Sequence, residues 1–343
     1  MNKTIISKAP LRLGLAGGGT DLPLFSKLFG GCVVNLTIKK YVYCKVISLN
    51  KKYVIFDSQD QNKISKYFFF NKKNLSYDHL SLLENIYFFV RDKYNKKKNF
   101  SVKIISYSEV PNGSGLGGSS TLVVAVMSAL LKYLNINISK KQLVADAIFL
   151  EREICKIPGG YQDQYAAVYG GLNFIEFKKN RNVFVSKIKT SDKFMNLLES
   201  SIMLFYYSKK RISSKVITNQ NDNIVKKNNK TLGALSKLKE EAIKLKQNIE
   251  ASDYKKFIIT LNKGWEEKQK TSKFIVDRNI NKILINLKKK GADSVKISGA
   301  GGGGFFFILT KLENRSKLTQ YLKKQNGILT ETCNITMEGV KSW

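Results

Sequence analysis

The chain has 343 residues, 43% of them hydrophobic, and 59 basic against 26 acidic side chains give a formal net charge of +33. This composition excludes an intrinsically disordered chain, and the length leaves room for two domains. Because no apolar run reaches the roughly 18 residues of a membrane span and no signal peptide is visible, we expect a cytoplasmic protein without membrane contact.

The N-terminal stretch predicts a strand at residues 4–16 that runs into a tight glycine turn, Gly17-Gly18-Gly19-Thr20-Asp21. In the simplest interpretation Asp21 caps a helix that begins at Leu22-Pro23; a substrate-binding loop is the alternative. After this turn we expect the following elements: one or two strands over 32–48, with 33–36 and 41–47 as the two halves, a β meander over 52–57 and 66–70, and a helix over 78–94.

A glycine-rich loop at 111–121 is the most informative stretch, with the sequence Pro-Asn-Gly-Ser-Gly-Leu-Gly-Gly-Ser-Ser-Thr. It lies between a predicted strand (100–106) and a predicted buried helix (122–134). Glycines let the backbone approach a ligand, and a helix start offers free N–H groups to an anion, so we expect a phosphate here.

Three interpretations of this loop compete. Gly113, Gly115 and Gly118 match the dinucleotide pattern, but no acidic residue occurs between Glu109 and Asp146, where that pattern wants one. The spacing also resembles a Walker loop, although a serine stands in place of its lysine. The third option is a turn that only caps the helix. The three hydroxyls at the helix start argue against it, because hydroxyls there can bind a phosphate or a phosphate-bound metal.

Two of the acidic residues that follow the loop are candidates for a role in the site. Glu151 lies in a second amphipathic helix, predicted at 140–155 and capped by Ser139, and Asp163 lies in the first turn of a short helix at 161–169. Between the two helices, Pro158-Gly159-Gly160 breaks the chain. A solvated glutamate, and an aspartate favoured by the helix dipole, explain both positions equally well without any catalytic role.

The remaining chain predicts strands at 172–177 and 201–207, a long polar helical region over 212–290, and a closing helix and strand at 316–324 and 328–335. The asparagine-rich part of the helical region, 219–230, is open to interpretation as a loose surface loop.

Near the C-terminus a strand–turn–strand unit at 295–309 encloses a run of glycines, Gly299-Ala-Gly-Gly-Gly-Gly304. Such a run cannot pack a core, so we expect it to let backbone approach a ligand or another loop. The change of texture around 190–200 predicts domains at 1–190 and 191–343.

The cysteines and the positive charge exclude several function classes. Four scattered cysteines and a single histidine argue against a disulfide framework or a zinc site. Lysines are spread along the whole chain and accompany no nucleic-acid-binding motif, so we expect no nucleic-acid partner. The positive field instead favours small anionic substrates.

Three motifs, at 9–21, 111–121 and 296–304, resemble in their order and spacing the GHMP small-molecule kinases, the superfamily of galactokinase, homoserine kinase and mevalonate kinase. The resemblance covers nearly the whole chain. It implies an α+β fold of two domains, the first like domain 2 of ribosomal protein S5 and the second ferredoxin-like, with the active site between them. It also implies ATP and Mg²⁺ as cofactors, and leaves a homo-oligomer open.

The resemblance assigns roles to individual residues. Asp163 would accept the proton of the attacking sugar hydroxyl, while Arg12 would hold that aspartate ionised and neutralise charge on the transferring phosphoryl group. Glu151 precedes Asp163 at the spacing that joins the magnesium carboxylate to the catalytic aspartate in galactokinase-like members, and Ser120 would face Mg²⁺. The residues expected around the ATP phosphates are Pro111, Gly113, Ser114, Gly115, Leu116, Gly117, Gly118, Ser119 and Ser120.

The first motif also bears on the substrate. Galactokinase-like members carry Gly-Glu-His-Thr-Asp where this chain has Gly17-Gly18-Gly19-Thr20-Asp21, which argues against galactose. The strings at 13–23, 159–166 and 170–174 look like those of D-glycero-D-manno-heptose 7-phosphate kinases, which phosphorylate the anomeric C1 hydroxyl for GDP-heptose and surface polysaccharide synthesis. The expected substrate residues are Gly18, Gly19, Thr20, Asp21, Gly160, Gly301 and Gly302.

Alternatives to this substrate remain. Fucokinase-type enzymes share part of the first motif, and a catalytically silent sensor with the same fold is a third option, against which the intact Asp163, Glu151, Ser120 and Arg12 argue. A substrate phosphate needs cations within hydrogen-bonding reach. Arg211, in the basic turn after the strand at 201–207, is the candidate from sequence; a solvated basic turn explains it equally well.

Overall fold

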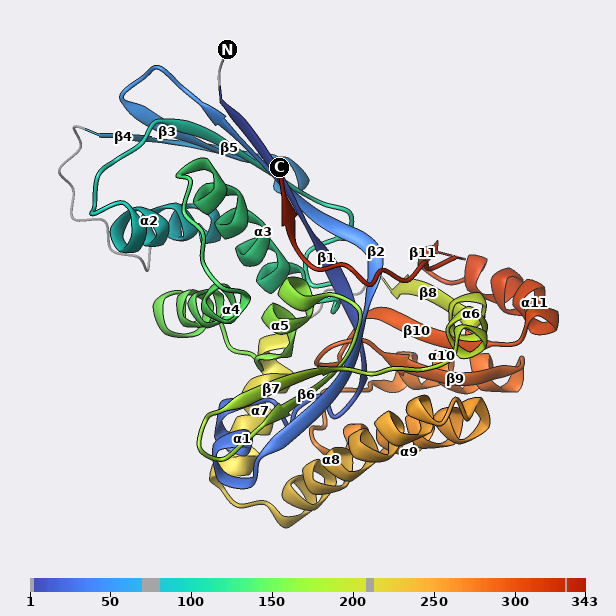
Figure 1. Cartoon of the computed structure of the whole chain (residues 1–343). Helices are drawn as coiled ribbons and strands as arrows, with labels where there is room; N and C mark the ends of the chain where they lie inside the picture. Colours follow the sequence, from blue (N-terminus) through green and yellow to red (C-terminus); the bar gives the residue numbers. More distant parts are fainter. Residues whose placement is uncertain (1–2, 70–80, 208–212, 331) are drawn as a thin grey trace.

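The computed structural model describes residues 3–69, 81–207, 213–330 and 332–343. Two sheets organise the chain, and helices cover both of them (Figure 1). The elements of the first part are β1 (Thr4–Ala16), α1 (Pro23–Phe29), β2 (Gly31–Ser48), β3 (Tyr53–Ser58), η1 (Gln59–Gln61), β4 (Lys63–Phe68), α2 (Leu82–Tyr94), β5 (Val102–Ser108), α3 (Gly118–Tyr133), α4 (Lys140–Phe149), η3 (Leu150–Ile154), α5 (Gln162–Tyr169), β6 (Leu172–Phe177) and β7 (Val183–Lys187).

The second part of the chain supplies the smaller sheet and most of the long helices. Its elements are α6 (Asp192–Ser201), β8 (Ile202–Tyr207), α7 (Ser213–Val225), α8 (Asn229–Glu250), α9 (Tyr254–Lys270), α10 (Arg278–Lys289), β9 (Ala292–Ile297), β10 (Gly304–Thr310), α11 (Leu312–Lys323), β11 (Gly327–Thr330) and β12 (Lys341–Ser342). The α+β class expected from the sequence is confirmed.

The larger sheet has eight strands in the order β12-β1-β2-β5-β3-β4, with β6 and β7 extending from β2. The long strands β1 and β2 pair antiparallel, with irregularities between Pro10 and Leu11 and between Gly14 and Ala16. Residues 31–36 of β2 pair with β6, and residues 42–48 pair with β5. β2 therefore pairs with β6 through its first residues and with β5 through its last, and so connects two parts of the sheet.

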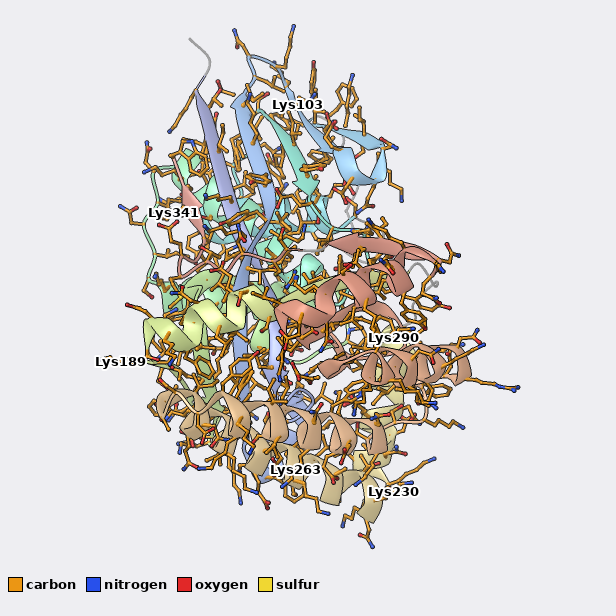
Figure 2. The ribbon with its side chains drawn as sticks, turned by 90° about the vertical axis from the view of Figure 1, so that its right-hand side faces the viewer. Lys103, Lys189, Lys230, Lys263, Lys290 and Lys341 are labelled. Carbon is orange, nitrogen blue, oxygen red and sulfur yellow. The ribbon has the colours of Figure 1, made fainter. Side chains whose placement is uncertain are left out.

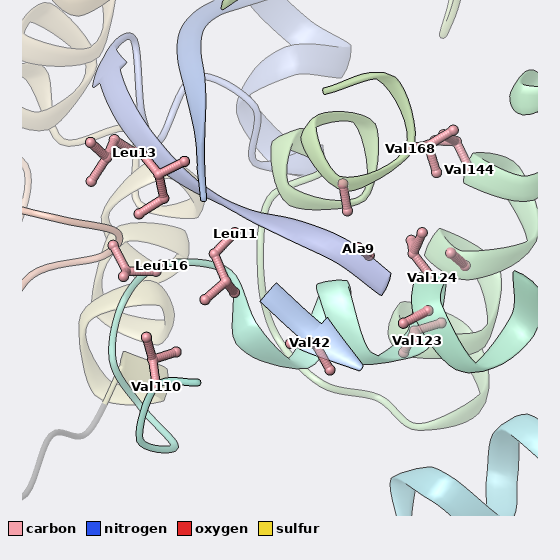
Figure 3. Packing of buried hydrophobic residues seen from close by; sticks show 14 of the residues in the cluster. Ala9, Leu11, Leu13, Val42, Val110, Leu116, Val123, Val124, Val144 and Val168 are labelled. Carbon is pink, nitrogen blue, oxygen red and sulfur yellow. The ribbon is translucent and has the colours of Figure 1, made fainter. Parts of the chain in front are cut away.

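The buried helix α3 packs against β1 and β2, and its apolar side chains explain why it forms there. Val123 and Val124 are completely buried and lie near Ala9 of β1 and Val168 of α5 (Figure 3). Because α3 begins at the end of the glycine-rich loop, this packing fixes the loop against the sheet.

The smaller sheet is antiparallel throughout, in the order β11-β8-β10-β9. Its core includes Phe205 of β8, Phe306 of β10 and Trp265 of α9. The helix predicted at 316–324 is α11, and the strand predicted at 328–335 is shorter, because β11 ends at Thr330.

The last residues return to the larger sheet. β12 pairs with β1 at Ser7 and Lys8, and Trp343 exchanges two main-chain hydrogen bonds of 2.9 Å with Ile6 (Figure 1). Apart from this returning segment, the larger sheet is formed by residues before the change in composition around 190–200, and the smaller sheet by residues after it. The domain boundary at 190/191 itself stays a prediction.

The prediction of a loose loop at 219–230 is wrong for most of that stretch. Residues 219–225 belong to α7, and α8 begins at Asn229 after a short turn capped by Asn228. Val216, Gln220 and Ile224 are buried at a spacing of four residues. A helix therefore forms in spite of the many asparagines, because Ile224 packs against residues of α1 and α8, Gln220 donates to Thr271, and Val216 packs into the core of the smaller sheet.

None of the helices within the described ranges is both long and apolar enough to cross a bilayer. Surface lysines such as Lys103, Lys189 and Lys290 lie at widely separated places on the molecule (Figure 2). The charge therefore spreads over many elements, as the sequence indicated.

Candidate active site

A cavity of about 1030 Å³ gathers all three sequence motifs on its walls. The first motif contributes Arg12, Gly18, Gly19 and Asp21, the central loop contributes residues 110–115 and 117–120, and the third motif contributes Gly299 and Ala300. Segments far apart in the sequence thus meet around one space large enough for a nucleotide and a second small molecule.

Arg12 and Asp163 form a bidentate ion pair on this wall. The guanidinium donates from Nε to Oδ1 at 2.7 Å and from Nη2 to Oδ2 at 2.8 Å, and its third contact goes to the Gly115 carbonyl at 2.6 Å. Arg12 is buried in β1, while the Asp163 side chain keeps 20% of its surface exposed. The pair therefore holds a partly exposed carboxylate in one orientation beside the glycine-rich loop.

Glu151 lies at the centre of a second buried network. Its carboxylate accepts hydrogen bonds from Ser119 Oγ at 2.8 Å, Ser120 Oγ at 2.6 Å and Gln164 Nε2 at 2.5 Å. It lies in the π-helical turn η3, which continues α4 where the sequence predicted one uninterrupted α-helix. The predicted metal residues Ser120 and Glu151 are therefore in direct contact.

Asp21 does not cap the following helix. α1 has no side-chain capping bond, and Asp21 instead accepts from the Gly19 main chain at 2.9 Å and from Gln162 at 3.2 Å. A Cβ atom at Gly160 would lie 1.9 Å from Asp21 Oδ2. A glycine at position 160 therefore lets the carboxylate approach the main chain closely.

The glycine-rich loop has the geometry of an anion site. Gly117 is the N-cap of α3 with φ of 83°, no side chain of the described residues caps this helix, and its first residues line the cavity, where its N–H groups are available to an anion. A Cβ atom at Gly117 would lie 3.2 Å from Asp163 Oδ2. The members of the predicted ATP set that line the cavity are Pro111, Gly113, Ser114, Gly115, Gly117, Gly118, Ser119 and Ser120.

Leu116 differs from the rest of this set. Its side chain is completely buried near Leu11 in the core, and its carbonyl accepts from the Arg12 main chain at 3.1 Å (Figure 3). It anchors the loop to β1 and does not line the cavity.

The third motif supports the loop from behind. Ser298 Oγ donates to the Gly115 carbonyl at 3.1 Å, and the Phe305 N–H donates to the Ser114 carbonyl at 2.8 Å. Of the two predicted substrate glycines in this motif, Gly302 donates to the Ile275 carbonyl and a Cβ at Gly301 would lie 2.7 Å from Ile275. This motif lets backbone approach other loops, as expected.

Three predicted substrate residues are not brought to the cavity. Gly301 and Gly302 contact the 274–275 segment, and the Thr20 hydroxyl is buried on the Gly17 and Cys32 carbonyls. Arg211 lies outside the described residues. Roles for these four residues stay predictions.

Several cavity residues escaped the sequence reasoning. Gln164, which is completely buried behind the cavity wall, adjoins Asp163 and donates to both Ser120 and Glu151. Arg152, beside Glu151, donates to the Gly160 carbonyl at 2.7 Å and so ties η3 to the loop that carries Gly160. The β3–β4 hairpin and the start of α2 also line the cavity, with Phe56, Ser58, Asp60, Asn62, Ile64, Leu82 and Leu83.

Lys268 was also missed, although the sequence held a signal for it. It continues the buried stripe of α9 formed by Phe257, Leu261 and Trp265, at a position where an apolar residue is usual. Its ammonium donates to the Gly18 carbonyl at 2.9 Å and lines the cavity.

Comparisons with known proteins agree with this geometry. Residues 81–171 match the model of the GHMP kinases N terminal domain, and residues 245–328 match that of GHMP kinases C terminal. A protein of Campylobacter jejuni named D-glycero-alpha-D-manno-heptose 7-phosphate kinase is 36% identical, over 99% of both chains.

Two further relatives cover most of the chain. The crystal structure of a D-glycero-D-manno-heptose 1-phosphate kinase from Bacteroides thetaiotaomicron is 29% identical with a TM-score of 0.81, and covers 99% of this chain and 98% of that one. The L-fucokinase/L-fucose-1-P guanylyltransferase of Bacteroides fragilis is 23% identical over 90% of this chain and 35% of that protein. The two-domain fold expected from the motifs is confirmed, and the chain belongs to the GHMP kinase family of phosphotransferases, which use ATP as phosphate donor.

Proposed function

We propose that this kinase phosphorylates the anomeric C1 hydroxyl of D-glycero-D-manno-heptose 7-phosphate and forms the 1,7-bisphosphate for GDP-heptose and surface polysaccharide synthesis. Similarity over the full length to the Campylobacter relative supports the sugar. The observation that carries the reaction type is the Arg12–Asp163 pair, which holds a carboxylate between the glycine-rich loop and the Asp21 side of the cavity.

Asp163 is the proposed proton acceptor. Its carboxylate takes the proton of the C1 hydroxyl as the sugar oxygen forms a bond to the γ-phosphorus of ATP, and the bond from that phosphorus to the bridging oxygen breaks to release ADP. Arg12 keeps the carboxylate oriented through two hydrogen bonds and supplies positive charge beside the transferring group. Asp21 and Gly160 lie on the sugar side and orient the hydroxyls of the ring.

The residues around Glu151 fit a magnesium ion. Mg²⁺ prefers oxygen ligands and usually binds through one or two carboxylates together with substrate phosphates. Glu151 and the Ser120 hydroxyl supply such oxygens, and the buried Oε1 of Gln164 beside them has no hydrogen-bond partner among the residues that the structure describes. Within the described ranges no cluster of three or more acidic, histidine or cysteine side chains forms a metal cage. When bound, the ion neutralises charge on the phosphates.

A fucokinase-like activity on an unphosphorylated sugar is the second candidate, supported by the similarity to the Bacteroides fragilis enzyme. A panel of sugars and sugar phosphates, assayed with ATP and with analysis of the product, separates the two. We expect turnover of heptose 7-phosphate and a product that is phosphorylated at C1. Equal activity on heptose and on its 7-phosphate contradicts the proposal and favours the fucokinase-like function. No turnover of any sugar favours a silent sensor.

We also propose the compartment of the reaction and the partners of the chain. We place it in the cytoplasm, because cytoplasmic ATP is the phosphate donor of this reaction. We propose a sugar phosphate and ATP as the partners of the chain, without nucleic acid, and a homo-oligomer stays open.

A further inference from the structure

A small alcove of about 30 Å³ adjoins the main cavity behind the first glycine motif. Arg12, Gly18, Gln162, Lys268 and Gly299 line both spaces, so the alcove is continuous with the sugar side of the cavity. Its remaining lining comes from Gly14, Leu15, Ala16, Gly17, Leu238, Gly264, Lys296 and Ile297. Among the described residues that line it there are three basic side chains and no acidic one.

Two buried or half-buried lysines approach this alcove from different elements. Lys268 of α9 donates to the Gly18 carbonyl at 2.9 Å and is 8% exposed, and Lys296 of β9 donates to the Leu15 carbonyl at 2.7 Å. Taking an ammonium group out of water costs free energy. Burial and the positive charges of Lys268 and Arg12 lower the pKa of Lys296 to about 7. An anion beside these lysines offsets that cost.

Glycines leave the room for such an anion. Among the described residues, a Cβ atom at Gly18 would meet only Gln162 Nε2, at 3.8 Å, so a side chain at position 18 would project into the cavity. A Cβ at Gly19, whose φ is 107°, would lie 3.2 Å from Lys268 Nζ. The two glycines therefore keep the approach to the Lys268 ammonium clear. A phosphate is larger than the alcove, so it would sit at its mouth, in the main cavity.

We infer that Lys268 binds the terminal phosphate of the sugar phosphate substrate, in the space that Gly18 and Gly19 leave open. This inference rests on the proposed function and names the cation that discriminates the phosphorylated sugar from the free one. A sugar whose C1 hydroxyl reaches Asp163 and whose ring lies along Asp21 extends its far end toward the first glycine motif. Lys296 lies behind that position, on the Leu15 carbonyl.

The test compares Lys268→Gln with the parent on two sugars. Glutamine keeps an N–H donor for the Gly18 carbonyl but removes the charge. We expect KM for heptose 7-phosphate to rise about 10- to 150-fold, the effect of losing one charge-assisted hydrogen bond, while KM for ATP and the weak activity on free heptose stay at the parent values. Lys268→Arg should recover most of the affinity. Lys263→Gln is the matched control, since Lys263 is an exposed lysine of the same helix (Figure 2).

Binding of heptose 7-phosphate without ATP, measured by calorimetry, gives a second readout if turnover is lost, and thermal unfolding shows whether the variant folds. An unchanged affinity, or an equal loss on both sugars, overturns the inference and leaves the proposed function standing. A parent that uses heptose and its 7-phosphate equally well overturns the proposed function itself, and the inference with it.

Discussion

The charged side chains on two walls of the same cavity differ in their hydrogen-bond partners. On the nucleotide wall the charged side chains face charged or hydroxyl partners: Arg12 pairs with Asp163, and Glu151 accepts from Ser119 and Ser120. On the sugar wall the ammonium groups of Lys268 and Lys296 donate to main-chain carbonyls, Gly18 and Leu15 respectively.

The difference follows from what each wall has to do. Chemistry needs groups that are already oriented before the substrates arrive, and paired charges in a buried network provide that orientation. Recognition of an anion needs positive charge that a ligand neutralises when it binds. We therefore expect substitutions on the nucleotide wall to change kcat, and substitutions on the sugar wall to change the affinity for one substrate.

The largest effect is expected at Asp163. Asp163→Asn keeps the size of the side chain and loses the proton acceptor, so kcat should fall about 10²- to 10⁴-fold, the range for a general base, with ATP affinity largely kept. Steady-state kinetics with a nucleotide-binding titration measure both quantities. Asp192→Asn is the control, since Asp192 is an exposed aspartate in the first turn of α6. Turnover near the parent level would remove Asp163 from the mechanism.

The next effect concerns the proposed magnesium residues. Glu151→Gln removes a charge that the metal requires, so kcat should fall about 10²-fold, and half-saturation should need more Mg²⁺. Ser120→Ala should shift the Mg²⁺ titration in the same direction by a smaller factor. Glu153→Gln changes an exposed glutamate of the same π-helical turn and serves as the control. If the Mg²⁺ titrations of Glu151→Gln and the parent overlay, the metal assignment fails.

On the sugar wall, Gly160→Ala should act on one substrate only. The added Cβ would lie 1.9 Å from Asp21 Oδ2, so the carboxylate has to move away from the sugar. We expect KM for the sugar to rise by about 10-fold, equivalent to one lost hydrogen bond, with KM for ATP unchanged. Gly233→Ala adds a methyl group where nothing lies within 4 Å and should leave both constants alone. A rise in both KM values would show that the loop acts on the whole cavity.

The last prediction concerns stability instead of kinetics, as a pH dependence at Lys296. Burial and the positive charges of Lys268 and Arg12 lower the pKa of Lys296 to about 7, whereas a lysine in the unfolded chain has a pKa of about 10.4. Between these values the unfolded chain binds more protons, so raising the pH through this window stabilises the parent.

Lys296→Met removes that titration, so the free energy of unfolding of the parent should rise relative to the variant between about pH 7 and about pH 10. Urea unfolding of both proteins across this range measures the difference. Lys263→Met, which removes an exposed lysine, should run parallel to the parent. A Lys296→Met curve that also runs parallel to the parent would mean that Lys296 titrates normally.

Local sequence was sufficient for the elements and for much of the nucleotide wall. Period-2 and period-3.6 patterns predicted β1, α3 and β10 close to where they lie. A cluster of glycines in the sequence marked the loop before α3, and Gly113, Gly115 and Gly117 have positive φ in the structure. Roles for Glu151, Asp163 and Arg12 came from the resemblance to a known family, because local patterns alone explained the two acidic residues equally well without a catalytic role. The loose loop expected at 219–230 failed because packing of a buried face overrides the weak helix propensity of asparagine.

Tertiary structure alone decided the rest. Lys268 is separated from Gly18 by most of the chain, and only the packing of α9 against β1 brings its ammonium to the first glycine motif. The contact of Gly160 with Asp21 and the return of β12 to β1 likewise join distant segments. A local pattern records which face of an element is apolar, but not which other element covers it. The composition of the loops could therefore be predicted from the sequence, whereas the set of side chains that share the cavity depends on how distant elements pack.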